Sequence, residues 1–137
     1  MKNILEIKNN LLKYNLKATP QRLCIANCLD IHGHMNVDEL YFLVSQEFPT
    51  ISVATIYKNI KIMLERVFIK EVKIPKQKSV YELNKAQHSH IVCSKCNKIV
   101  DIQLQTEELL RSASQISNFT LNESAIVLNG VCPECSK

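Results

Sequence analysis

The first third of the chain carries apolar residues at helical spacing, separated by short breaks. In residues 3–15 the apolar side chains fall at three- and four-residue intervals, which predicts an amphipathic helix. A second helix is expected after Thr19, because threonine can cap a helix and the following Pro20 suits its first turn. We expect this helix to end around Gly33.

Two further helices are predicted before the pattern changes. Asn36 and Glu39 have the spacing of a capping box, and Pro49 ends the helix that follows them. Ser52 then caps a fourth helix over residues 53–65. In this helix Ile56, Ile60 and Leu64 are expected to face inward, with Met63 alongside.

Beyond residue 67 the pattern alternates. Residues 68–74 and 79–83 predict a two-stranded hairpin around the basic loop at 75–78. Helices followed by a hairpin are typical of a winged helix-turn-helix domain. The rest of the chain predicts three strands, at residues 88–92, 98–104 and 121–131, and one helix, at residues 106–116.

These elements predict an α+β protein in two parts. An N-terminal winged helix-turn-helix domain is expected at residues 1–84, a hinge at 85–87 and a small α/β domain at 88–137. A part of about fifty residues usually needs a metal, disulfides or a partner subunit to be stable.

Composition and charge narrow the class of partner. Apolar residues make up 46% of the 137, enough for a folded core. Residues 1–86 hold 13 Lys and Arg against 8 Asp and Glu, whereas residues 87–137 hold 4 against 5. The basic first part suits an anionic partner such as nucleic acid, or is an ordinary solvated surface. The chain has no run of 18 apolar residues and no secretory signal pattern, so we expect it in the cytoplasm.

In a reducing cytoplasm the six cysteines are not expected to form structural disulfides. Cys24 and Cys28, four apart on a predicted helix, are interpreted as small core residues. The others form two Cys-x-x-Cys pairs, which can give four thiolates to one closed, tetrahedral zinc site. Redox pairs are the alternative, but neither pair opens a helix within a βαβ unit. The four residues are Cys93, Cys96, Cys132 and Cys135.

A second group of residues suits a different metal. His88 and His90 point to one face of a predicted strand, and Asp101 falls roughly opposite His88 if the chain folds back around residues 94–97. Two imidazoles and a carboxylate suit Fe(II), Mn(II), Zn(II) or Co(II). The alternative is two exposed histidines and a solvated aspartate. The other candidate ligands are Glu82 and His34.

Six motifs together are specific to one family. They are KATPQR at 17–22, GHMNVDELY at 33–41, SVATIYKNIKIM at 52–63, SVYEL at 79–83, HSHIVCSKCNKIVDI at 88–102 and GVCPEC at 130–135. The chain resembles the ferric uptake regulator family of bacterial transcription factors over nearly its whole length. The resemblance implies a homodimeric repressor, not an enzyme, that binds double-stranded, A/T-rich and pseudo-palindromic operator DNA. It implies that residues 88–137 form the dimerisation domain.

The resemblance also assigns the metal ligands. It implies structural zinc at the four cysteines named above. It implies a regulatory Fe(II) or Mn(II) site at His34, Glu82, His88, His90 and Asp101. His34 is preferred to His32 because it directly precedes the MNVDELY helix. A metal held by both domains would fix the spacing of the two DNA-reading helices in a dimer.

The DNA contacts follow from the same resemblance. Residues 53–65 correspond to a recognition helix, with Tyr57 placed against thymine methyl groups and Lys58 against a base or phosphate. Partial burial is the alternative for Tyr57. Ser52 and Thr55 are expected at phosphates, and Lys17 at an A/T-rich minor groove.

The signals for the sensed molecule conflict, but the pattern of site residues resembles the peroxide-sensing branch of the family most closely. Asp101 is similar to peroxide-sensing members, whereas Glu82 is similar to iron sensors. In the first case Fe(II) and hydrogen peroxide would oxidise His34 or His88 and release the DNA. The alternatives are a repressor of iron, zinc or manganese uptake and, outside the family, a metal-dependent hydrolase or a zinc-storage module.

Two residues depart from the family pattern. Val67 stands where glycine is usual, and a β-branched residue is costly in a left-handed conformation, so the helix end is expected to be reshaped. Asn97 also replaces a glycine but tolerates that conformation.

Overall fold

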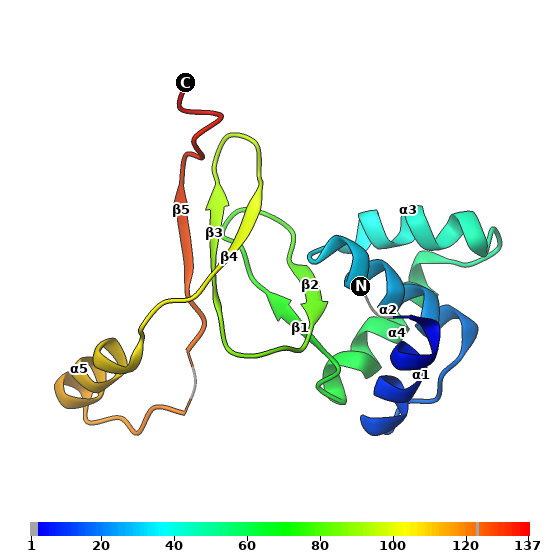
Figure 1. The fold of residues 1–137 in the computed structure, drawn as a ribbon, viewed down its shortest axis with the longest axis horizontal. Helices are drawn as coiled ribbons and strands as arrows, with labels where there is room; N and C mark the ends of the chain where they lie inside the picture. The colour runs from blue at the N-terminus through cyan, green and yellow to red at the C-terminus, as the bar shows by residue number, and fades with distance from the viewer. Residues whose placement is uncertain (1–2, 123) are drawn as a thin grey trace. The chain divides into compact units, whose positions relative to one another are not determined.

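The chain forms two compact units, Met1–Lys85 and Ala86–Lys137, in a computed structural model that describes residues 3–122 and 124–137 (Figure 1). Among the described residues, no helix is long and apolar enough to cross a membrane. The assignment of a DNA-binding domain, a hinge and a dimerisation domain to residues 1–84, 85–87 and 88–137 stays a prediction.

The first unit begins with four helices that start at capped positions. The Oγ1 atom of Thr19 accepts a hydrogen bond from the backbone N–H of Arg22, and Asn36 and Glu39 form the predicted capping box. The side chain of Ser52 caps the fourth helix. These caps satisfy backbone N–H groups that a helix leaves without partners in its first turn. The helices are α1 (Ile4–Lys13), α2 (Pro20–His32), α3 (Val37–Glu47) and α4 (Val53–Glu65).

The hairpin that follows α4 completes the winged-helix fold. Its strands are β1 (Ile69–Val72) and β2 (Val80–Leu83), which pair antiparallel. Met35, just after α2, exchanges two backbone hydrogen bonds with Tyr81 of β2, at 2.8 and 3.1 Å. This bridge ties the loop after α2 to the wing. It therefore places His34 beside the strand that carries Glu82.

The core of the first unit lies between the helices and the hairpin. Ile25 of α2, Leu40 of α3 and Ile56 of α4 are completely buried in it. Met63 is completely buried as well, whereas Leu64 is only partly buried and packs against the cluster. Seven residues make almost two full helical turns, so Met63, and not Leu64, shares the direction of Ile56. The expected inward face of α4 is corrected accordingly.

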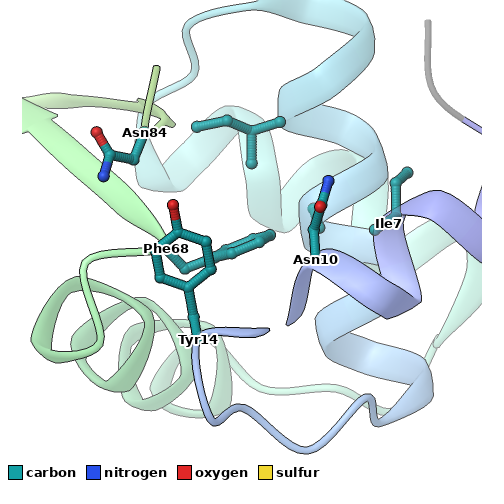
Figure 2. A pocket seen from close by; sticks show the side chains of 7 residues that line it. Ile7, Asn10, Tyr14, Phe68 and Asn84 are labelled. Carbon is teal, nitrogen blue, oxygen red and sulfur yellow. The ribbon is translucent and has the colours of Figure 1, made fainter. Parts of the chain in front are cut away.

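A small cavity of about 100 Å³ lies between α1 and the hairpin (Figure 2). Tyr14 and Phe68 line it with their rings edge to face, at a centroid distance of 5.6 Å and an angle of 76°. Ile7, Asn10 and Asn84 form other parts of the wall. Sites for small molecules usually occupy several hundred Å³, so this cavity is a packing feature of the core.

Val67 adopts the left-handed conformation that a glycine would take, with φ of +60°. Its backbone N–H donates to the Leu64 carbonyl, and the N–H of Phe68 donates to the Met63 carbonyl, both at 3.0 Å. These two bonds form a Schellman motif, the usual end of a helix at a left-handed residue. The expected reshaping is therefore wrong: the chain keeps the turn and accommodates valine in it, with the side chain half exposed.

The second unit is built on a three-stranded sheet in the order β4-β3-β5. Its strands are β3 (Ser89–Cys93), β4 (Ile99–Ile102) and β5 (Val127–Gly130), with β4 antiparallel and β5 parallel to β3. Asn97, in the turn between β3 and β4, has a φ of +64°, as its position predicts. The strand predicted at residues 121–131 is shorter than expected, because only β5 (Val127–Gly130) is formed among its described residues.

The helix of the second unit is α5 (Glu107–Ser117), which links β4 to β5 and lies beyond one end of the sheet (Figure 1). None of its residues is buried. The four helices with a wing in the first unit, and the helix with a small sheet in the second, confirm the predicted α+β fold class.

Candidate metal centres

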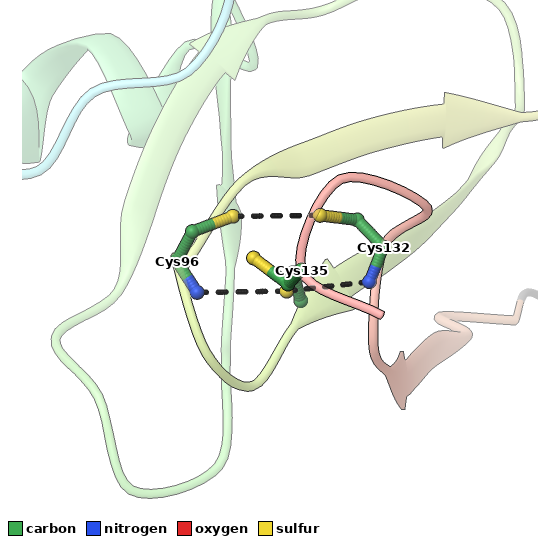
Figure 3. Close-up of side chains that lie close together, drawn as sticks. Cys96, Cys132 and Cys135 are labelled. Carbon is green, nitrogen blue, oxygen red and sulfur yellow. Dashed lines mark hydrogen bonds between the residues drawn. The ribbon is translucent and has the colours of Figure 1, made fainter. Parts of the chain in front are cut away.

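Four cysteine sulfurs of the second unit converge at the end of the sheet where β3 and β5 end. Cys93 and Cys96 lie at the turn after β3, and Cys132 and Cys135 lie in the segment after β5. Parallel pairing places Gly130 opposite Cys93, so both segments leave the sheet at the same end. Figure 3 shows the side chains of Cys96, Cys132 and Cys135 turned toward one another.

The distances between these sulfurs fit a tetrahedral ion. The Sγ atoms of Cys96 and Cys132 are 3.8 Å apart, and all four ligand atoms lie within 4.8 Å of one another. Zinc–sulfur bonds of about 2.3 Å in a tetrahedron place neighbouring sulfurs about 3.8 Å apart. The cluster therefore has the dimensions of a closed, structural zinc site.

The surroundings of Cys93 favour its thiolate. Its Sγ atom accepts the backbone N–H of Cys132 at 3.4 Å and that of Cys96 at 3.5 Å. These hydrogen bonds, the Cys132 bond first, lower the pKa of the Cys93 thiol from 9.0 to about 6. Thiolate is the form that binds metal, so this sulfur is prepared for an ion at neutral pH.

The second cluster of ligands lies on β3, on the residue just before it and on β4. The Oδ1 atom of Asp101 is 3.5 Å from Nε2 of His90 and 3.8 Å from Nε2 of His88. The two imidazole rings are 4.5 Å apart, centroid to centroid. Two imidazole nitrogens and a carboxylate oxygen at this separation suit a first-row divalent ion.

The register of the two strands corrects one expectation. Asp101 is paired with His90, not with His88. Because His88 and His90 are two residues apart, their side chains share one face of the sheet, and pairing with either residue keeps Asp101 on that face. The convergence expected from the sequence therefore holds, with a different partner.

His88 is oriented as a metal ligand would be. Its Nδ1 atom lies 2.8 Å from the backbone carbonyl of Ala86. In the tautomer that donates this bond, the proton is on Nδ1 and the lone pair is on Nε2, which faces Asp101. Metal-bound histidines usually donate their other ring N–H to a carboxylate, a backbone carbonyl or water in this way. The sequence could not show it, because the acceptor is a backbone atom.

The first unit contributes a further pair of ligand groups. Nε2 of His34 lies 3.0 Å from Oε2 of Glu82, and the Glu82 side chain is buried. A buried carboxylate is costly without a cation beside it. The structure thus holds both ligand sets that the sequence predicts: four thiolates suited to zinc, and imidazoles and carboxylates suited to Fe(II) or Mn(II).

The residues expected at DNA lie on the surface of the first unit. Tyr57 on α4 is 52% exposed, and Lys58 and Lys17 are exposed. Ser52 and Thr55 lie at the start of α4 with their hydroxyl oxygens 3.0 Å apart. Hydroxyl groups and one lysine thus lie on the first two turns of α4, whereas Lys17 precedes α2.

Cys24 and Cys28 pack against the core, as interpreted from the sequence. Burial is the main cause that raises the pKa of both thiols, that of Cys24 to about 12. Protonated thiols are poor nucleophiles and poor metal ligands. These two cysteines are therefore structural.

Comparison with known proteins agrees with the geometry. The model of the "Ferric uptake regulator family" matches residues 13–129. The peroxide-responsive repressor PerR of Staphylococcus epidermidis is 36% identical over 130 residues, which cover 93% of this chain and 87% of the relative. PerR of Staphylococcus aureus is 37% identical over 128 residues, 92% of this chain and 86% of the relative. The crystal structure of a Campylobacter jejuni peroxide stress regulator superposes with a TM-score of 0.70 at 30% identity, covering 98% of this chain and all of that one. The chain therefore belongs, as its motifs predict, to the ferric uptake regulator family, whose members are dimeric DNA-binding repressors and not enzymes.

Proposed function

We propose that this protein is a metal-dependent repressor that senses hydrogen peroxide through a regulatory Fe(II) or Mn(II) site. The observation that carries the proposal is the cluster of His88, His90 and Asp101, which offers two imidazoles and a short carboxylate on one face of a sheet. The similarity to peroxide-responsive repressors over more than nine-tenths of the chain supports it.

The regulatory site takes ligands from both units in this proposal. The His34–Glu82 pair and the β3–β4 cluster offer the same type of ligand atoms, and only five residues separate Glu82 from His88 in the chain. One ion held by all five side chains would restrict the arrangement of the two units. Because such an ion binds one arrangement better than others, it shifts the population toward the form that fits DNA.

In the sensing step, one of the metal ligands is itself oxidised. An Fe(II) ion held by these side chains would supply the electron that cleaves hydrogen peroxide, and it would regain that electron from the oxidised ring. In the overall reaction, one peroxide molecule transfers one oxygen atom to a ring carbon of His34 or His88 and leaves as water. An oxidised ring is a poorer ligand, so the restriction on the two units is lost. Mn(II) in the same site would support DNA binding but not this chemistry, because it is harder to oxidise.

DNA recognition is assigned to the first unit. Tyr57 and Lys58 on α4 read the major groove, Ser52 and Thr55 contact phosphates, and Lys17 enters an A/T-rich minor groove. The operator is pseudo-palindromic because the repressor is a homodimer. We place this activity in the cytoplasm.

The second unit supplies the dimer interface in this proposal. Its exposed apolar side chains are too many for an isolated unit of its size, since such patches usually mark an interface. They lie on and beside α5 and on and just after β5, and they include Leu104, Leu109, Ile116, Phe119, Leu121, Leu128 and Val131.

Operator binding tests the proposal. An operator is selected from random DNA with the Mn(II)-loaded protein, and its binding is measured with Fe(II) or Mn(II), before and after peroxide. We expect both metals to support binding and peroxide to release only the Fe(II) form. Release by peroxide from both forms, or from neither, would contradict the proposal.

A repressor of metal uptake is the second candidate, and Glu82 favours it. That residue is similar to iron sensors, and its buried carboxylate lies beside His34. In this case the same operator would be released by removing the metal, and peroxide would have no effect on the Fe(II) form.

A further inference from the structure

Arg22 joins two parts of the first unit that are far apart in the chain. Its Nη1 atom donates to the backbone carbonyl of Lys17 at 3.1 Å, and its Nε atom donates to Oδ1 of Asn59 at 3.1 Å. Lys17 precedes α2, and Asn59 lies in the middle of α4. A guanidinium group suits such a bridge because its donors are held in one rigid plane.

Both ends of the bridge are held by further hydrogen bonds. The Lys17 carbonyl also accepts the backbone N–H of Thr19 at 2.9 Å, and Thr19 in turn caps α2. The Nδ2 atom of Asn59 donates to the Thr55 carbonyl at 3.0 Å, which turns Oδ1 of Asn59 toward Arg22. The bridge thus links the backbone of Lys17 to a fixed position on α4.

The bridge lies at the border between the core and the surface proposed to face DNA. Arg22 and Asn59 are half-buried, whereas the Lys17 side chain is exposed. Asn59 directly follows Tyr57 and Lys58 and precedes the buried Ile60. Neither bridge residue needs to touch DNA to affect how the groups beside it are presented.

We propose that Arg22 is a positioning residue, which holds Lys17 at a fixed offset from α4 so that both can engage one DNA duplex. This inference rests on the proposed function, in which Lys17 enters the minor groove and α4 reads the major groove. The two grooves have a fixed separation on the duplex, so the protein must present both groups in register. Without the bridge, the loop that carries Lys17 must be ordered when DNA binds, and that ordering reduces the affinity that Lys17 adds.

A double-mutant cycle on the intact, Mn(II)-loaded protein tests this role. Lys17→Ala is made in the native chain and in three backgrounds: Arg22→Lys, Asn59→Ala and Arg66→Lys. The first keeps the charge but loses the planar fork, and the second removes the other end of the bridge. Arg66→Lys is the matched control, since it makes the same exchange at the end of α4, outside the bridge. Operator affinity is measured by fluorescence anisotropy at one salt concentration.

The expected result is a loss of coupling. Lys17→Ala lowers operator affinity about tenfold in the native chain and in Arg66→Lys, but less than about threefold in Arg22→Lys and Asn59→Ala. A purely structural Arg22 would lower thermal stability and leave the effect of Lys17→Ala unchanged. An equal effect of Lys17→Ala in every background therefore overturns the inference. If Arg22→Lys does not fold, Asn59→Ala alone decides the outcome.

The failure of the inference and that of the proposed function give different results. A native protein that binds no selected operator contradicts the proposed function and the inference with it. A native protein that binds its operator, with a tenfold effect of Lys17→Ala that persists in the bridge variants, contradicts only the role of Arg22. No effect of Lys17→Ala in the native chain overturns both the Lys17 contact and its positioning by Arg22.

Discussion

Asp101 is paired with His90 across the β3–β4 ladder, and its Oδ1 atom lies 3.5 Å from Nε2 of that histidine. The same oxygen lies 3.8 Å from Nε2 of His88. One carboxylate thus faces two imidazoles, and this arrangement is the basis of the proposed sensing site. The Asp101 side chain is the least buried of the three, with 34% of it exposed.

Replacing this carboxylate should weaken the regulatory metal site without affecting zinc. Asp101→Asn keeps the shape of the side chain but removes its negative charge. We expect the affinity for Mn(II), measured by calorimetry, to fall about a hundredfold. Glu108→Gln, on the exposed first turn of α5, is the control and should bind Mn(II) as the native protein does. Equal affinity in both variants would exclude Asp101 as a ligand.

Loss of the four-thiolate site should unfold the second unit only. In Cys96→Ser one of the four ligands is lost, and a unit of this size depends on its metal for stability. We expect the variant to lose zinc and the dimer, while the helices of the first unit, which have their own core, keep their circular dichroism. Cys28→Ser should retain zinc and the dimer. A zinc-free Cys96→Ser protein that remains a folded dimer would show that the metal is not structural.

Cys24 should be unreactive at neutral pH. Burial, the largest cause, raises the pKa of its thiol from 9.0 to about 12, so the thiol stays protonated up to strongly alkaline pH. At pH 8 its thiolate fraction is about a thousandfold lower than that of an ordinary cysteine. Iodoacetamide labelling, followed by peptide mass spectrometry, should therefore be slow in the folded protein, fast in urea and faster as pH rises. Peroxide-driven release of DNA should persist in Cys24→Ser. Rapid labelling of the folded protein at pH 8 would contradict this environment.

Val67→Gly should stabilise the first unit. Valine has a φ of +60° here, and the left-handed conformation costs a residue with a Cβ atom about 1 kcal/mol. We expect Val67→Gly to raise the free energy of unfolding by about this amount in urea titrations. Val67→Ala is the control at the same site, because it removes the exposed branch but keeps the Cβ atom. A gain of the same size in both variants would show that the backbone is not the source of the strain.

Local signals predict the helices of the first unit well, because each start is encoded within a few residues. Thr19, Ser52 and the Asn36–Glu39 capping box all lie where the structure begins a helix. The inward face of α4 is predicted less sharply: Leu64 and Met63 are both expected there, but Met63 is completely buried and Leu64 only partly. Adjacent residues of a helix differ by only 100° in direction.

Long-range features were predicted less well. The partner of Asp101 depends on the length of the turn after β3, which the alternating pattern does not determine. An error of two residues preserved the face of the sheet, so the metal cluster was still recognised. The bridge from Arg22 to Asn59 was missed, because no local spacing connects residues that are 37 positions apart.

The most direct test of peroxide sensing is the mass of the two histidine-containing peptides after a peroxide pulse. The protein is loaded with Fe(II) or with Mn(II), exposed to hydrogen peroxide and divided between peptide mass spectrometry and operator binding. Peroxide sensing predicts a gain of one oxygen atom on the peptide of His34 or His88 in the Fe(II) form only, in proportion to the DNA released. Release of DNA from the Fe(II) form with neither histidine oxidised would contradict it.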